Sequence, residues 1–217
     1  MGSGNLWLFA GPNGAGKTSL ARHPWFVDRL RDYTRLNADD RTLEKIKAGG
    51  WAGFADVPDA ELRSIFIKAA GETYAETVSA LDGGVHICSE TVLSTPKYQE
   101  LVEQVQSKGG IFEMVYVALR SPSVSRERVS LRFGKGGHDV PTDKLAERWR
   151  RSLEYLPWFA SRADHVWVID NSDSTEGRLP LLVASGGEGK ARLSCDESLV
   201  FPELLAALRS AFPGLTP

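Results

Sequence analysis

The sequence is poor in cysteine. Cys88 and Cys195 are the only two among 217 residues, and Cys88 lies in an apolar run. So few cysteines do not make the disulfide framework of a small secreted domain. We therefore expect reduced thiols and a cytoplasmic protein.

The chain also lacks long apolar segments. No run approaches the roughly 20 residues that a membrane span requires. Residues 1–5 have neither the basic nor the apolar region of a signal peptide. We expect no membrane partner.

An excess of charge of one sign is missing as well. Lys and Arg number 26 against 28 Asp and Glu, which gives a net charge of -2. This balance provides no global attraction to nucleic acid, which is therefore disfavoured as a partner, although a short nucleic-acid end stays open. The hydrophobic content of 42% and the length suit one globular domain, residues 1–217.

Against these absences stands one glycine-rich motif. The apolar run 6–10 leads directly into G-P-N-G-A-G-K-T, a match to the phosphate-binding pattern G-x-x-x-x-G-K-T. Its glycines let backbone N–H groups turn around a phosphate, and a helix starting near Lys17 directs its positive end at the same anion. Lys17 would reach the β/γ-phosphates and the Thr18 hydroxyl would hold Mg²⁺. The predicted nucleotide-binding residues are Gly11, Pro12, Asn13, Gly14, Ala15, Gly16, Lys17, Thr18 and Ser19.

The alternation of apolar runs and helix-like segments predicts an α/β fold. We expect a P-loop NTPase/kinase-like three-layer sandwich with a mostly parallel five-stranded sheet, in a core of about residues 5–172. The expected strands are 6–10, 33–36, 85–88, 112–119 and 165–169. The expected helices begin at Pro58, Thr95, Pro122 and Pro141 and end near Leu81, Gly109, Gly134 and Ala163. The tail, about residues 178–213, predicts a β-hairpin at the sheet edge with its turn at 185–189, then a helix from Pro202 to about Phe212.

Two familiar classes of P-loop protein do not fit. The GTPase motifs D-x-x-G and N-K-x-D are absent. The segment A-S-G-G-E, residues 184–188, resembles the ABC signature L-S-G-G-Q. A true signature begins a helix and precedes a buried strand ending in Asp, whereas K-A-R-L-S and the tail follow here. We therefore interpret the segment as a hairpin turn.

A concentration of basic residues favours a small-molecule kinase. Residues 120–151 hold nine basic residues against four acidic ones. Phosphoryl transfer spreads negative charge over three oxygens, which cations must meet. Arg128 and Arg132 share a helical face, which is unfavourable unless an anion lies between them. We predict a basic helical lid over about 121–152; the alternative is a solvated basic face.

Carboxylates follow two of the predicted strands. A kinase acting on a hydroxyl needs one to accept the proton, and N-A-D-D after the second strand offers Asp39 and Asp40. At most one of these faces the site, and the other is expected to cap a helix beginning near Arg41. Spacing does not choose between them. Glu90 follows the third strand and would position substrate or hold a Mg²⁺-bound water; the alternative is a solvent-facing glutamate.

Taken together, these residues resemble the zeta-toxin family of P-loop kinases. The resemblance runs over about residues 6–172 and is closest to the stand-alone branch often labelled predicted ABC-type ATPase or kinase. The matching stretches are G-P-N-G-A-G-K-T (11–18), N-A-D (37–39), S-E-T (89–91), G-G-H-D-V-P (136–141) and R-W-R-R-S-L (148–153), with D-N-S (170–172) after the last predicted strand.

The resemblance implies Mg-ATP-dependent phosphorylation of an alcohol group, in the better-known toxins the 3′-hydroxyl of the amino sugar of UDP-N-acetylglucosamine. It implies the following roles: Lys17 for phosphate, Thr18 for Mg²⁺, Asp39 as base, Glu90 with Thr91 for substrate, and Arg128 as a lid arginine. One feature departs from the family pattern, because His138 stands where the toxins have a second lid arginine. Arg132, or Arg148 and Arg151, would then supply the charge, and His138 would donate a hydrogen bond to the phosphoryl group or the substrate.

The acceptor stays open at this point. A nucleotide sugar leads, and an antibiotic, a nucleoside or a nucleic-acid end is the alternative. A non-catalytic nucleotide-binding module is the rival outside catalysis. The toxins are controlled by an antitoxin that blocks the ATP site, and no such partner is visible in this chain.

Overall fold

The strands form one continuous sheet. The computed structural model describes residues 2–133, 142–175 and 178–216, without the side chains of residues 132, 133, 142 and 143. The strand order is β2-β3-β1-β4-β5-β6-β7. The strands are β1 (Leu6–Ala10), β2 (Thr34–Leu36), β3 (Ile87–Thr91), β4 (Phe112–Ala118), β5 (His165–Asp170), β6 (Leu181–Gly187) and β7 (Lys190–Leu193).

The first five strands are parallel to one another, and β6 and β7 are antiparallel to their neighbours. The predicted five-stranded sheet is therefore too small. The tail hairpin pairs with β5 through Val166 and Gly186 and continues the same sheet, which has seven strands. An unpaired β5 edge would leave backbone donors and acceptors open, and β6 satisfies them.

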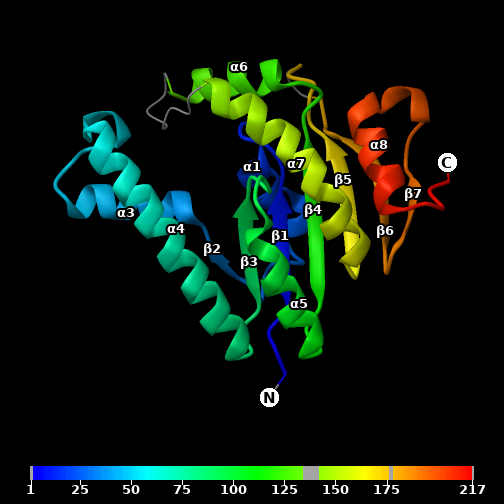
Figure 1. Cartoon of the computed structure of the whole chain (residues 1–217), viewed down its shortest axis with the longest axis horizontal. Helices are drawn as coiled ribbons and strands as arrows, with labels where there is room; N and C mark the ends of the chain where they lie inside the picture. Colours follow the sequence, from blue (N-terminus) through cyan, green and yellow to red (C-terminus); the bar gives the residue numbers. More distant parts are fainter. Residues whose placement is uncertain (1, 134–141, 176–177, 217) are drawn as a thin grey trace.

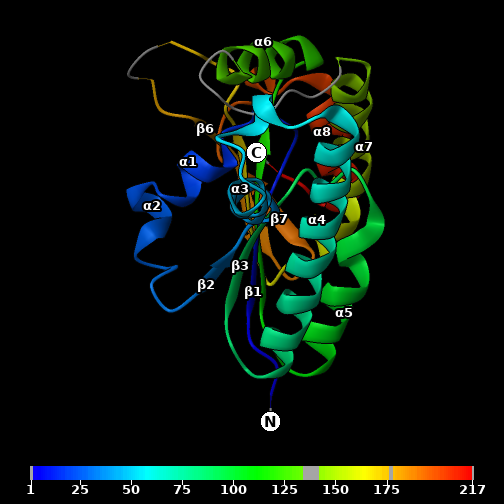
Figure 2. The ribbon, with the colours of Figure 1, turned by 90° about the vertical axis from the view of Figure 1, so that its left-hand side faces the viewer.

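Helices cover the two faces of the sheet unequally. The α-helices are α1 (Lys17–Ala21), α2 (Pro24–Val27), α3 (Ala38–Ala48), α4 (Asp59–Asp82), α5 (Gln99–Ser107), α6 (Pro122–Phe133), α7 (Thr142–Arg162) and α8 (Pro202–Ala211), with 3-10 turns at Phe54–Asp56, Pro96–Tyr98 and Glu197–Leu199. In Figures 1 and 2, α4, α5, α7 and α8 lie on one face, the short α1 and α2 lie on the other, and α6 lies across the top. The three-layer sandwich is thus confirmed. No helix in the described ranges is long and apolar enough to cross a membrane.

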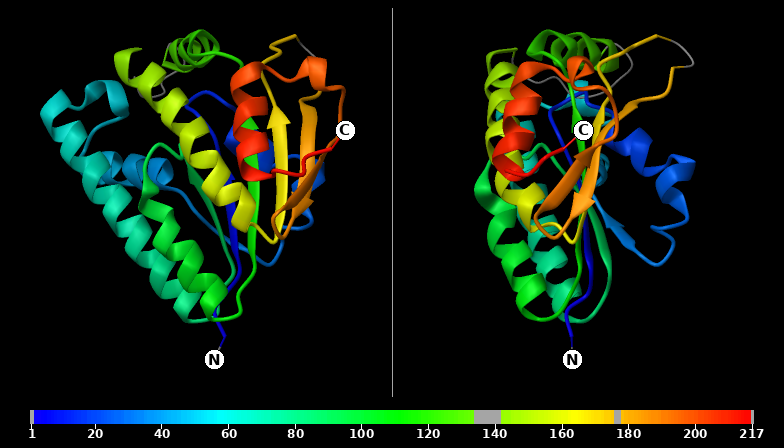
Figure 3. Two further views of the ribbon diagram at one scale, coloured as in Figure 1. Left: turned by 45° about the vertical axis from the view of Figure 1, so that its right-hand side comes forward. Right: turned by 90° about the vertical axis from the view of Figure 1, so that its right-hand side faces the viewer.

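The central strand β1 explains where the core sits. All five of its residues are buried. Leu6, Leu8 and Ala10 belong to the larger core beneath α4, α5, α7 and α8. Trp7 and Phe9 point to the other side and pack with residues of α1 and α2, such as Phe26. Because successive side chains of a strand alternate between faces, a strand buried on both sides is apolar throughout. Figure 3 shows the same two-sided arrangement from the far edge.

Both ends of α4 are as predicted from the sequence, with Pro58 before the helix and Gly83 after it. The start of α3 differs from the prediction. The helix begins at Ala38, and the side chain of Asn37 caps it by accepting a hydrogen bond from the Asp39 N–H at 2.8 Å. Asp39 and Asp40 both lie in the first turn, so the expectation that one of them caps a helix beginning near Arg41 is wrong.

The ends of β3 and of the hairpin also differ from the prediction. β3 continues to Thr91 because it pairs with β1 as far as Ala10, so Glu90 lies within the strand and not after it. The hairpin turn is only two residues long. Glu188 and Gly189 both have positive φ, 52° and 74°, as a tight turn between twisted strands requires. The segment resembling an ABC signature therefore lies in β6 and its turn, and not at the start of a helix.

Candidate active site

The glycine-rich loop leaves β1 at its carboxyl end and leads into α1. Gly11 has φ 139°, and a Cβ at this position would lie 2.1 Å from the Val117 carbonyl oxygen of β4. Only glycine fits so close to the neighbouring strand. The loop is therefore held against the sheet, where the Gly11 N–H also donates a hydrogen bond to the Thr91 carbonyl at 3.2 Å. The motif predicts that this loop binds a nucleotide phosphate.

Lys17 lies across this loop. Its Nζ donates hydrogen bonds to the carbonyl oxygens of Gly11 at 2.8 Å and Pro12 at 3.1 Å. A single ammonium group bound to two loop carbonyls places a positive charge at the rim of the loop. The motif predicts that this lysine binds the phosphates of a nucleotide.

Thr18, the next residue, contacts the acid of β3. The Thr18 hydroxyl donates a hydrogen bond of 2.7 Å to Glu90 Oε2. The Glu90 side chain is only 8% exposed, so it faces the loop and not the solvent. Its neighbour Thr91 points to the other face of the sheet, where its hydroxyl accepts a hydrogen bond from the Leu93 N–H at 3.1 Å. The structure thus brings Glu90 to the loop and gives the Thr91 hydroxyl a local partner.

The two aspartates of α3 lie on different sides of the helix. Both are exposed. Asp39 shares a helical side with Thr42 and Ile46, three and seven residues further on, and these two are fully buried. Asp40 shares its side with the exposed Glu44 and Lys47. Helical geometry therefore places Asp39 at the edge of the inward face and Asp40 toward solvent.

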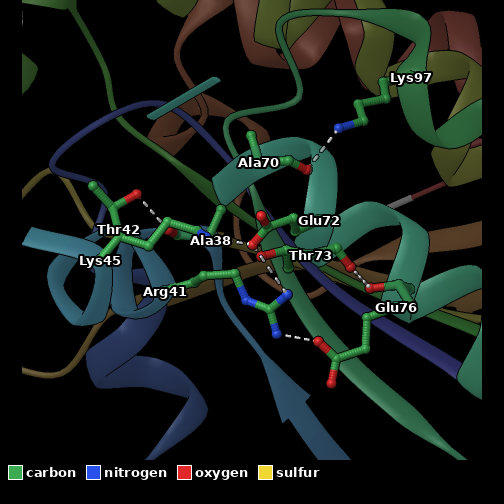
Figure 4. A network of polar contacts seen from close by, with 10 residues as sticks. Ala38, Arg41, Thr42, Lys45, Ala70, Glu72, Thr73, Glu76 and Lys97 are labelled. Atoms are coloured by element: carbon green, nitrogen blue, oxygen red, sulfur yellow. Dashed lines mark hydrogen bonds and ion pairs between the residues drawn. The ribbon is translucent and has the colours of Figure 1, made fainter. Parts of the chain in front are cut away.

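Ion pairs hold α3 against α4 (Figure 4). The Arg41 guanidinium contacts the Glu76 carboxylate, and Lys45 Nζ lies 2.6 Å from Glu72 Oε2. Arg41 also lies 4.0 Å from Glu72. We call these four residues the α3–α4 ion cluster. The cluster links α4 to the helix whose first turn carries Asp39.

Helix α6 lies against the other side of the loop. The buried Ser125 hydroxyl donates to the Asn13 carbonyl at 2.6 Å. Arg128 donates to the Asp173 carbonyl at 3.3 Å and to Ser174 Oγ at 3.0 Å. Partial burial lowers the pKa of the Arg128 guanidinium, and nearby carboxylates, that of Glu127 first, oppose this effect. Arg128 therefore connects α6 with the segment after β5. The Arg132 side chain and His138, predicted as further catalytic residues, lie outside the described part of the chain.

Two residues at the site carry contacts that the sequence reasoning did not assign. Asn171, just after β5, donates from Nδ2 to the Ala15 carbonyl at 2.8 Å. Arg35 on β2 pairs with Glu90. Both partners are distant in sequence. Two features of the sequence could have indicated them. Arg35 is a charged residue within a predicted strand, and the polar stretch D-N-S follows a predicted apolar strand.

Comparisons with known proteins identify a family for this chain. The family model described as Zeta toxin matches residues 3–177. No curated protein matches the chain.

Among solved structures, the PezAT chromosomal toxin–antitoxin system of Streptococcus pneumoniae is 16% identical with a TM-score of 0.54, over 98% of this chain and 79% of that one. AvrRxo1-ORF1:-ORF2 with ATP is 15% identical with a TM-score of 0.60, over 98% and 65%. A putative kinase from Chloroflexus aurantiacus is 21% identical with a TM-score of 0.50, over 67% and 76%. At these identities the solved structures establish the fold alone, and the family model establishes the family. The chain belongs to the zeta-toxin family and has its P-loop kinase-like fold.

Proposed function

We propose that this protein is a Mg-ATP-dependent kinase that phosphorylates a hydroxyl group of a small molecule. One observation carries the proposal: the phosphate-binding loop, Lys17 and the Thr18–Glu90 contact lie together at the carboxyl end of the parallel strands. Ligands of open α/β sheets bind at this edge. Asp39 follows β2 at the same edge and supplies a carboxylate for the acceptor.

Each residue has a distinct part in this proposal. When bound, Mg-ATP supplies the phosphoryl group and a cation that neutralises its oxygens. The glycine-rich loop orients the phosphates through its backbone N–H groups, and Lys17 exchanges its carbonyl partners for phosphate oxygens. Thr18 contributes its hydroxyl oxygen to the metal. Arg128 adds positive charge from α6. Asp39 accepts the proton of the substrate hydroxyl.

Membership of the zeta-toxin family makes a nucleotide sugar, UDP-N-acetylglucosamine first, the leading acceptor class. The ATP-bound AvrRxo1 structure supports ATP as the cofactor. Because PezAT and AvrRxo1-ORF1 are both described with a second component, we include an antitoxin polypeptide as a partner in the proposal, and a cytoplasmic site of action. Because His138 replaces an arginine of the family pattern, the test also includes other acceptors, namely an antibiotic, a nucleoside and a nucleic-acid end.

The test is direct. The protein is incubated with Mg-ATP and a panel of these acceptors, and each is examined by mass spectrometry for the gain of one phosphate. Wild type should modify one acceptor, and Lys17→Ala should modify none. Tight ATP binding by wild type without transfer to any acceptor would favour the non-catalytic nucleotide-binding module.

A further inference from the structure

Arg35, which has no role in the proposed function, pairs with Glu90 of β3. Arg35 is opposite Cys88 in the parallel β2–β3 pair, so its side chain lies on the same face of the sheet as Glu90, two residues further along β3. Glu90 is opposite Phe9 of β1, two residues before the glycine-rich loop. The contacts therefore run from the edge strand, through β3, to Thr18 on α1.

Both oxygens of the Glu90 carboxylate are engaged in this arrangement. Oε1 accepts a hydrogen bond from Arg35 Nη2, and Oε2 accepts one of 2.7 Å from the Thr18 hydroxyl. Glu90 is nearly buried, and burying a carboxylate is unfavourable unless a cation compensates its charge. Arg35 is this cation. Because the guanidinium binds one oxygen, the orientation of the carboxylate is fixed. In this orientation the other oxygen accepts the hydrogen bond from Thr18.

The direction of the Arg35 side chain is informative. Arg35 lines an open hollow of about 410 Å³ together with Arg31, Tyr33 and Cys88, among others. The Arg35 side chain is 26% exposed, and its guanidinium points inward to Glu90. Arg31 in the same hollow pairs instead with the exposed Asp28, at 3.0 Å. Of these two arginines, Arg35 is the one that pairs with Glu90.

The chemistry of the hydroxyl gives this pairing a consequence. A threonine hydroxyl has one proton and two lone pairs. Once the proton is donated to Glu90, the lone pairs are directed elsewhere, and a lone pair is what Mg²⁺ takes from an oxygen ligand. We propose that Arg35 is a positioning residue for the metal: it orients Glu90, which in turn fixes the Thr18 hydroxyl with its lone pairs available to Mg²⁺. This inference rests on the proposed function, because the metal is the one that accompanies ATP.

The experiment measures nucleotide binding and not turnover. The affinity for a non-hydrolysable ATP analogue is determined by calorimetry with and without Mg²⁺, and the ratio of the two affinities is the metal enhancement. Outer partners of metal ligands typically contribute 10- to 100-fold, so Arg35→Met should reduce the enhancement by about 10-fold. Arg35→Lys, which keeps a cation beside Glu90, should retain most of it. Arg31→Met is the matched control from the same hollow and should leave it unchanged.

A double-mutant cycle tests whether Arg35 acts through Glu90. Glu90→Gln alone should lower the metal enhancement, and adding Arg35→Met should lower it less than about 2-fold further, since residues that act through one another are not additive. This background also leaves no buried carboxylate unpaired if Arg35→Met alone does not fold. Unchanged enhancement in folded Arg35→Met, full additivity in the cycle, or a wild type without metal enhancement would overturn the inference. A wild type that binds no nucleotide would instead overturn the proposed function.

Discussion

The side-chain amide of Asn171 donates a 2.8 Å hydrogen bond to the Ala15 carbonyl, and so joins the end of β5 to the glycine-rich loop. The next residue of the loop, Gly16, has φ 88°, and a Cβ there would lie 2.7 Å from Asn171 Nδ2. The loop is therefore shaped by its own glycines and also by a side chain 156 residues away.

Gly16→Ala should therefore disturb both the backbone and its contact with Asn171. A left-handed conformation costs a non-glycine residue about 1–2 kcal/mol, and the contact with Asn171 adds to this. We expect a lower free energy of unfolding in urea and weaker nucleotide binding. Gly50→Ala is the matched control, because Gly50 has φ 90° with no atom within 4 Å of the added Cβ. Equal losses for the two variants would contradict the role of Asn171, and Asn171→Ala should recover part of the loss in the Gly16→Ala background.

Turnover should depend on the carboxylate of Asp39 and not on that of Asp40. Asp39 lies beside the buried side of α3, whereas Asp40 lies on its solvent side. Asp39→Asn should lower turnover by at least about 100-fold, the usual scale of general base catalysis, while nucleotide affinity changes little. Asp40→Asn should keep near wild-type turnover. Steady-state kinetics with whichever acceptor the mass-spectrometry panel finds checks both, and the reverse result would assign the base to Asp40.

The α3–α4 ion cluster should matter more for turnover than for stability. Its side chains are between 26% and 46% exposed, and such pairs are typically worth no more than about 1 kcal/mol. Arg41→Met should therefore lower the free energy of unfolding by about 1 kcal/mol or less. Because α3 carries Asp39, we expect a larger relative loss in kcat, with ATP affinity retained and part of the loss reproduced by high salt.

The control for the cluster is Arg150→Met on α7, which removes an exposed pair with Glu154 within one helix. This variant should change neither quantity appreciably. A kcat for Arg41→Met equal to that of wild type would show that α3 does not depend on the cluster for its position.

The two thiols should react at different rates. Burial raises the pKa of Cys88 to about 12. A raised pKa means less thiolate at a given pH, so at pH 8 very little Cys88 carries the reactive form. Cys195 is partly exposed, although burial also raises its pKa. A thiol reagent at pH 8 should therefore modify Cys195 first, and Cys88 only after unfolding. Rapid modification of a Cys195→Ser variant in its folded state would contradict this expectation.

Local sequence was sufficient where an interaction is local. Pro58 and Gly83 mark the ends of α4 because φ restriction and helix termination act within a few residues. Lys17 reaches carbonyls five and six residues away in its own loop, so the motif itself predicts its place. The end of β3 could not be predicted in this way, because hydrogen bonds with β1 extend the strand through polar residues.

The amino-acid sequence by itself determined the α/β class, the glycine-rich loop with Lys17 and Thr18, and the family, since all of these depend on short-range patterns. Only the tertiary structure decided that the hairpin continues the sheet, that Asn171 supports the loop, and that Arg35 compensates Glu90. The physical reason is sequence separation. Arg35 and Glu90 are 55 residues apart, and only the parallel pairing of β2 with β3 brings their side chains to one face.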